Sequence, residues 1–151
     1  MASFVYVVLE RAGEAATKEE KIKILRDNNS FALRTVLQGG MDSSVEFILP
    51  EGRPPFSLEE SKKWGFTPSA IQRAAKKLKF FVKNGPGQSM ASVKREKMFI
   101  TLLETMHPEE AELLILMKDK SLIKKTGTAH YKGITKKLVI EAFPGLLKAE
   151  D

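Results

Sequence analysis

Residues 117–146 read MKDKSLIKKTGTAHYKGITKKLVIEAFPGL, and the interpretation of the whole chain starts from this stretch. A basic loop at residues 124–133 leads into residues 134–142, whose apolar side chains recur at the spacing of one helix face. Pro144 and Gly145 end this run, because proline cannot continue a helix and glycine accepts a left-handed conformation. The stretch therefore predicts a loop followed by a short, half-buried helix.

The start of this short helix is a candidate site for a phosphate group. Lys124, Lys125 and Lys132 come before it, together with the backbone amides around Gly133. Unpaired N–H groups and the positive end of the helix dipole attract an anion at such a position. The alternative is a solvated lysine loop that caps a structural helix, and the stretch alone leaves both interpretations open.

Length and composition predict one helical domain over residues 1–151, large enough to bury a single core without disulfide bonds. The chain has no cysteine, which excludes disulfides and thiolate metal sites. No apolar run is long enough to span a bilayer, and the first residues, MASFVYVVLERAGE, lack the basic start of a signal peptide. We therefore expect a soluble protein of the cytoplasm.

The net charge of +6 is unevenly distributed along the chain. Residues 61–100 contain ten Lys or Arg and one acid, Glu96, and residues 118–137 contain seven lysines and one acid, Asp119. The remainder of the chain is acidic. Two separate basic segments in an acidic chain predict a positive face that binds a polyanion, although a basic side without a function is the alternative.

Apolar periodicity and helix-start signals predict three short helices in residues 4–37. The clearest start is the capping box of Thr17 and Glu20, in which the hydroxyl accepts an amide of the first turn. The third helix is expected to end at Gly39 and Gly40. Residues 41–56 contain several prolines and one short strand-like alternation, so we expect a packed loop there and not the edge of a sheet.

Two longer helices are expected in the middle of the chain. The first begins at Thr67 and Pro68, an N-cap and a proline at the first helical position, and its apolar stripe extends to Val82. The second covers residues 89–106, and another helix begins at Pro108. Together with the helices at either end, these signals predict an all-α fold, a compact bundle of about seven short helices without a sheet.

No arrangement of residue types indicates catalysis or cofactor binding. The two histidines, His107 and His130, belong to no cluster of His, Asp and Glu with the spacing of metal ligands. The G-x-x-x-x-G-K-[ST] phosphate loop and the G-x-S-x-G nucleophile elbow are both absent. We therefore expect a protein without catalytic residues, metal or other cofactor, which is not an enzyme.

Two blocks of sequence carry a resemblance to a known family. The first is AATKEEKIKILRDNNSFALRTVLQGGMD at residues 15–42, and the second combines AELLILMKDK at residues 111–120 with KGITKKLVIEAFPGLL at residues 132–147. Both blocks resemble the N-terminal, all-helical DNA-binding domain of ATP-dependent DNA ligases, in the form found in tailed phages. The chain departs from that domain at residues 122–131, where it inserts a lysine-rich loop.

This resemblance implies a binder of double-stranded DNA, intact or nicked, that contacts phosphates across the minor groove and reads no sequence. It does not imply ligation, which needs a lysine nucleophile in a K-x-D-G setting. The nearest string, Lys118-Asp119-Lys120, lacks both the spacing and the glycine. We therefore expect a stand-alone relative of the DNA-binding domain, similar to small phage proteins.

The expected DNA-contacting surface joins the C-terminal loop and helix start to a cationic cluster in residues 89–106. That cluster lies in the first half of its helix, where the dipole disfavours cations, which indicates an anionic partner outside the chain. Lysines gain affinity for DNA by releasing condensed counterions, and a glycine lets backbone amides approach a phosphate. The expected contacts are Lys94, Arg95, Lys97, Lys124, Lys125, Lys132, Gly133, Thr135, Lys136 and Lys137.

Two other classes of function stay open. One is a protein-interaction adaptor for replication, repair or transcription machinery, which keeps the helical scaffold without affinity for DNA. The other is an accessory subunit that supplies a DNA-binding domain to an enzyme that lacks one. Salt-dependent binding of duplex DNA by the isolated chain separates a DNA-binding protein from an adaptor.

Overall fold

The computed structural model describes residues 3–57, 67–122 and 131–148, and helices joined by loops make up this part of the chain. Within these ranges it forms seven α-helices, one 3-10 helix and no strand, which confirms the expected all-α fold. The elements are α1 (Val5–Glu14), α2 (Lys18–Asp27), α3 (Phe31–Met41), α5 (Ser69–Ala75), η1 (Leu78–Phe81), α6 (Ser92–Leu103), α7 (Pro108–Lys118) and α8 (Lys136–Ala142).

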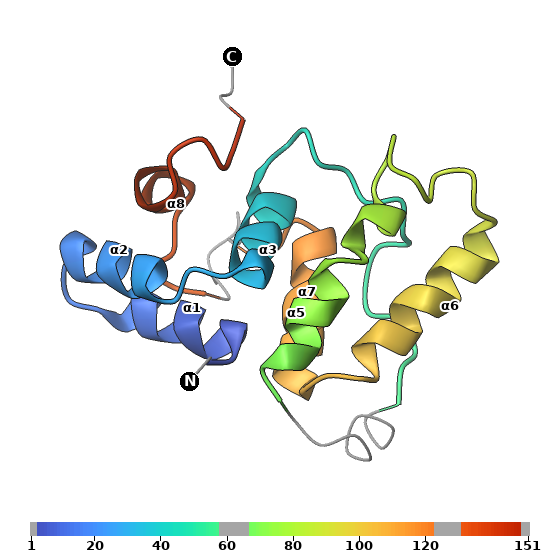
Figure 1. Cartoon of the computed structure of the whole chain (residues 1–151), viewed down its shortest axis with the longest axis horizontal. Coiled ribbons are helices and arrows are strands. Elements are labelled where there is room, and N and C mark those ends of the chain that lie inside the picture. The colour runs from blue at the N-terminus through green and yellow to red at the C-terminus, as the bar shows by residue number, and fades with distance from the viewer. Residues whose placement is uncertain (1–2, 58–66, 123–130, 149–151) are drawn as a thin grey trace.

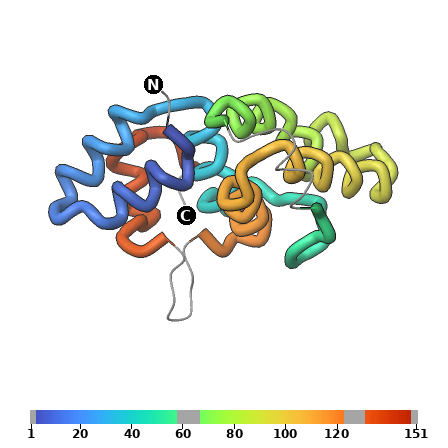
Figure 2. The backbone as a smooth tube through the Cα atoms, turned by 90° about the horizontal axis from the view of Figure 1, so that it is seen from below, coloured from blue at the N-terminus to red at the C-terminus, as the bar shows by residue number. Residues whose placement is uncertain are grey.

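The helices are arranged in three groups along the longest axis of the molecule (Figure 1). At one end α2 packs between α1 and α8, and at the other end α6 packs on α7 and η1. The centre holds α3, which packs on both α5 and α7. Since α7 also contacts α1, the helices α3 and α7 connect the two ends (Figure 2).

The starts of α2, α3, α7 and α8 agree with the signals in the sequence. The predicted cap at Thr67 is wrong, because Pro68 occupies the N-cap position of α5 without a side-chain cap, and α6 begins at Ser92 and not at residue 89. The hydroxyl of Thr17 accepts the amide of Glu20 at 3.2 Å, as its capping box predicts. Ser30 and Thr135 cap α3 and α8 in the same way, and Nδ1 of His107 accepts the amide of Glu109 at 3.0 Å at the start of α7. Each of these caps depends on contacts within one turn, which is why sequence patterns reveal them.

The prediction that Gly39 and Gly40 end the third helix is wrong. Helix α3 continues through both glycines to Met41, and both are buried. A Cβ atom on Gly39 would lie 2.9 Å from Sδ of Met117, and one on Gly40 would overlap the side chain of Leu122. The two glycines therefore serve close packing of α3 against α7 and the residues that follow it, not helix termination.

The predicted helix from Thr67 to Val82 is interrupted. The α-helical part ends at Ala75 and a 3-10 helix follows. A tertiary contact ends the helical segment before Val82, since the carbonyl of Phe81 accepts the amide of Ile48 at 2.8 Å and the amide of Lys83 donates to the carbonyl of Glu46 at 2.8 Å. These bonds need extended backbone at residue 82, so a helix cannot continue there. They form one isolated β-bridge, and apart from Met41, which ends α3, residues 41–56 are otherwise the loop that the sequence predicts.

A buried carboxylate joins α7 to the start of α1. Glu110 is 1% exposed, and its two oxygens accept the amides of Val5 at 2.9 Å and Tyr6 at 3.0 Å. No side chain of α1 itself caps these amides, because Phe4 occupies the N-cap position. Glu110 thus satisfies N–H groups that a helix start leaves without partners, from a position more than one hundred residues away in the sequence.

The close contact between α3 and its neighbours predicts a cost for any side chain at residue 40. In an open helix Gly→Ala gains up to about 1 kcal/mol, but here we expect Gly40→Ala to lower the free energy of unfolding by about 1–3 kcal/mol through overpacking. Urea unfolding of Gly40→Ala, Leu122→Ala and the double variant measures this. The alanine at residue 40 should cost less in the Leu122→Ala background, and equal costs in both backgrounds would contradict the predicted clash.

Burial raises the pKa of the Glu110 carboxyl from 4.5 to about 7, against the opposing effect of its two amide donors. The folded state therefore holds a proton that the unfolded state has already released. The contribution of Glu110 to the free energy of unfolding is fully present below the pKa that this carboxyl has in the unfolded state. It is lost as the pH rises through about 7. We expect the free energy of unfolding to fall by roughly 3 kcal/mol at most between pH 5 and 8. In Glu110→Gln this fall should disappear, and an unchanged pH profile would contradict the prediction.

Candidate functional site

Several basic side chains are committed to the backbone of the fold. Their nitrogen atoms donate to main-chain carbonyls at helix ends and in loops, which need donor partners when water is excluded. For example, Lys21 donates to the carbonyls of Gly13 at 3.0 Å and Gly133 at 3.1 Å. The side chains with this role are Lys21, Arg26, Arg95, Lys118 and Lys120. Their charges hold segments together and are poorly placed to bind an external anion.

Arg95 has a structural role and not the surface role that the sequence predicts. Its guanidinium donates to the carbonyls of Ile48 at 3.0 Å, Met90 at 2.8 Å and Gly87 at 3.4 Å. The side chain is half-buried and ties α6 to the two loops beside it. Lys94 and Lys97, the other members of the predicted cluster, are exposed.

Two residues near α8 that the sequence predicts to contact DNA, Thr135 and Gly133, have structural roles. Thr135 accepts the amide of Leu138 at 3.1 Å, so its hydroxyl caps the helix. Gly133 has a φ of +83°, and a Cβ atom there would overlap the carbonyl of Gly13. Glycine is therefore required at this position for the chain to pass close to the end of α1, whether or not a phosphate binds.

The predicted lysines around α8 differ in their surroundings. Lys132 and Lys137 are exposed, whereas Lys136 is half-buried. Lys124 and Lys125 lie outside the described residues. Lys137 borders a small hollow beside α2, in which Lys18 forms an ion pair with Glu141 at 2.7 Å. This carboxylate partly offsets the positive charge of the hollow.

Among the described residues, the predicted contacts on α6 and those around α8 do not form one surface. Helix α8 lies beside α2 at one end of the long axis, and α6 lies at the opposite end (Figures 1 and 2). The central helices α3 and α7 separate them (Figure 1). The sequence could not indicate this separation, because it depends on how the helices pack and not on their order.

A groove between α6 and α5, including the turn after α5, gathers a different set of cations. It consists of two connected hollows of about 570 Å³ each, which share Lys77, Thr101 and Leu102. We call it the α5–α6 groove. The basic side chains that line it are Arg73, Lys76, Lys77, Lys94 and Lys97.

The positive charge of the α5–α6 groove is not compensated within the described part of the chain. No described residue that lines it is an Asp or a Glu. The acids of α6 and its C-terminal end face elsewhere, since Glu96 lines a separate hollow and Glu104 accepts the amide of Ser57 at 2.7 Å. Arg73 donates to Ser69, whereas the lysine ammonium groups form no bond with any described residue. Such a cluster attracts an anion.

Three cations of the α5–α6 groove were missing from the set predicted from sequence, namely Arg73, Lys76 and Lys77. The excess of positive charge in residues 61–100 was the available signal. It could not show which of the ten basic residues meet on one face. That depends on the end of α5 at Ala75 and on the packing of α5 and α6 against the central helices.

A protein-family model matches residues 8–124, which is most of the chain. The chain belongs to this family, a family of unknown function (DUF6433). No curated protein and no solved structure matches the chain. The matched region contains the whole α5–α6 groove and ends before α8, so the groove is a feature of the region shared with the family.

Membrane-spanning helices and metal clusters are both absent from the part of the chain that the structure describes. None of its helices is both long and apolar enough to cross a membrane. Nor do three or more of its His, Asp and Glu side chains come together in a way that holds a metal ion.

Substitution of Arg95 and of Lys97, which both lie on α6, compares a basic side chain that stabilises the fold with one that is exposed at the surface. Arg95→Ala removes three hydrogen bonds to backbone carbonyls, so we expect it to lower the free energy of unfolding by roughly 2 kcal/mol or more. Lys97→Ala removes an exposed side chain and should change it by less than about 0.5 kcal/mol. Chemical denaturation of both variants measures the difference. Equal losses would show that Arg95 has no structural role.

Proposed function

We propose that the protein binds DNA through its phosphate backbone, without sequence preference and without catalytic turnover. The observation that carries this proposal is the α5–α6 groove, where five cations gather without a described carboxylate. A buried or paired cation would give no affinity for an external partner. The lysines of this groove have no such partner within the described residues.

The dimensions and chemistry of the groove suit a strand of phosphates. Helix α6 has 12 residues and is therefore about 18 Å long, a distance over which one DNA strand carries about five phosphates. Lysine neutralises a phosphate as a flexible point charge, and the released counterions favour binding. Contacts of this kind position a protein on DNA but do not read bases.

The resemblance to the DNA-binding domain of DNA ligases supports the same proposal from the sequence. It favours double-stranded DNA, intact or nicked, as the partner. Lys132, Lys136 and Lys137 near α8 remain predicted contacts, but they lie at the opposite end of the molecule from the groove (Figure 1). We assign the main binding site to the groove and propose the cytoplasm as the location of the protein.

One observation favours a second candidate function, that of a protein-interaction adaptor or accessory subunit for replication, repair or transcription machinery. The floor of the α5–α6 groove is apolar, with Val93, Met98 and Leu102 among its lining residues. An amphipathic helix with acidic flanks would match both the floor and the cations. Failure of the isolated protein to bind any nucleic acid at low salt would favour this function over DNA binding.

Substitution of Lys77 and Lys94 tests the proposed site. We expect Lys77→Ala/Lys94→Ala to weaken binding to duplexes of any sequence and to lower the slope of log affinity against log salt by roughly 2, about 0.9 for each phosphate that is no longer neutralised. Fluorescence anisotropy at several salt concentrations measures both quantities. Both side chains are exposed, so the fold should survive.

The matched comparison is Lys132→Ala/Lys136→Ala/Lys137→Ala, which removes charge at the other end of the molecule. This triple variant should change the affinity and the salt slope less than the groove variant. If it abolishes binding while the groove variant binds like the parent protein, the DNA site lies at α8 and our assignment is wrong.

A further inference from the structure

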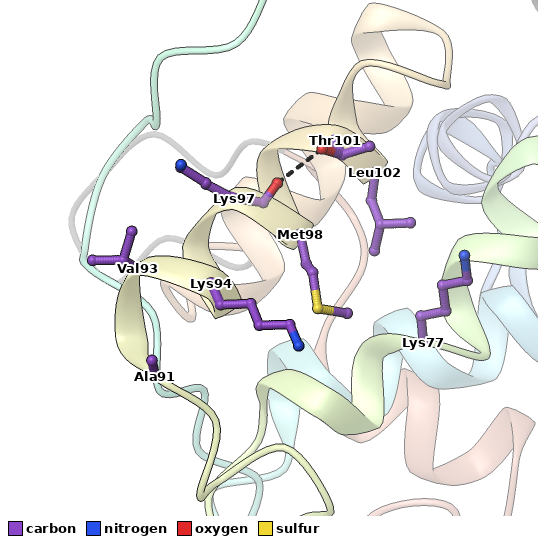
Figure 3. Close-up of a pocket in the computed structure, with 8 residues that line it drawn as sticks. All are labelled: Lys77, Ala91, Val93, Lys94, Lys97, Met98, Thr101 and Leu102. Carbon is purple, nitrogen blue, oxygen red and sulfur yellow. Dashed lines mark hydrogen bonds between the residues drawn. The ribbon is translucent and has the colours of Figure 1, made fainter.

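We infer that the α5–α6 groove takes a nucleic-acid strand whose bases are unpaired, in preference to an intact duplex. This inference rests on the proposed binding of DNA phosphates, and it departs from the double-stranded partner that the resemblance favours. It starts from a feature that phosphate binding does not explain, the apolar floor of the groove. Met98, which is half-buried, and Leu102 form this floor, and Val93, which is 63% exposed, lines the same hollow on the far side of Lys94 (Figure 3).

The floor lies between cations. In Figure 3 the side chains of Met98 and Leu102 lie between Lys94 on one side and Lys77 on the other, while Lys97 points away from both. A phosphate gains nothing by covering an apolar surface, whereas an aromatic base gains from each square ångström that it removes from water. The thioether of Met98 adds a favourable sulfur–aromatic contact. A base that lies on the apolar floor, with its neighbouring phosphates beside Lys77 and Lys94, contacts both the apolar and the cationic side chains of the groove.

The size of the groove separates a single strand from a duplex. Each hollow has a volume of about 570 Å³, which lies within the range of pockets for small molecules. In a duplex the bases are paired and stacked inside the helix, so a duplex can lay its phosphates across the rim but cannot place a base on the floor. It would then leave Met98 uncovered. A strand with unpaired bases can place one base in each hollow.

The groove has few groups that can read the identity of a base. Its three threonine hydroxyls already have partners, since Thr101 donates to the carbonyl of Lys97 at 2.9 Å and Thr105 to that of Leu102 at 2.7 Å. The hydroxyl of Thr67 lies 2.9 Å from that of Ser69. Contact with the apolar face of a base is tolerant of sequence, because every base has such a face. The groove therefore distinguishes unpaired from paired bases, and not one base from another.

The experiment compares four fluorescent ligands of equal length: oligo-dT, oligo-rU, an abasic deoxyribose-phosphate strand and a duplex. We expect the parent protein to bind oligo-dT roughly two- to tenfold more tightly than the abasic strand, and more tightly than the duplex. Val93→Ser/Met98→Gln removes the apolar contact but no charge. It should reduce the affinity for oligo-dT to that for the abasic strand, without changing the salt slope or duplex binding.

Ile140→Ser is the matched control, because Ile140 is an exposed β-branched residue on α8, 47% exposed and far from the groove. It should bind every ligand like the parent protein. Thermal unfolding of each variant confirms that the fold is intact. Equal affinity of the DNA and RNA strands would support the inference, because the groove recognises the chemistry that the two share.

Two outcomes separate this inference from the proposed function. If the abasic strand and the duplex bind as tightly as oligo-dT, and Val93→Ser/Met98→Gln changes nothing, the inference is wrong while DNA binding stands. If no nucleic acid binds at low salt, the proposed function and the inference both fail. Binding of a synthetic acidic amphipathic peptide in that case, abolished in Val93→Ser/Met98→Gln, would assign the groove to a protein partner.

Discussion

The close contact of α3 with α7, and with Leu122 after α7, determines how α5 and α6 lie relative to each other. Gly39 and Gly40 permit this contact, because a side chain at either position would meet Met117 or Leu122. Helix α5 packs on α3, and α6 packs on α7. The distance between α5 and α6, and with it the shape of the α5–α6 groove, therefore depends on how closely the two central helices approach. A packing constraint in the core thus positions the cations at the surface.

The second general feature is the division of the basic residues into two groups. Some, such as Arg95 and Lys118, satisfy backbone carbonyls that would otherwise lack donors, and they belong to the fold as much as apolar side chains do. Others, such as Lys77 and Lys94, have no partner within the described residues and meet in one groove. Net charge counts both groups equally. Only the second group bears on binding, which is why a positive net charge locates no site by itself.

The groove combines two properties that support the proposed binding of a nucleic acid. Its rim is cationic, and its lining includes apolar side chains such as Met98 and the exposed Val93. Exposed apolar surface between charges costs free energy unless a partner covers it. The α8 lysines have no comparable apolar floor within the described residues, and Glu141 lies beside them. The groove also lies inside the region that matches the family, whereas α8 lies outside it.

Local patterns of residues were enough to predict the all-α fold and most helix starts, because each cap joins atoms within one turn, and they located the two basic segments. Other features arise only when the helices pack together. Packing extends α3 through its glycines, interrupts the helix after Ala75 and pairs Glu110 with the start of α1. It also turns Arg95 inward and joins Lys77 to Lys94 in one groove. These outcomes depend on contacts between residues far apart in the chain, which no local pattern encodes.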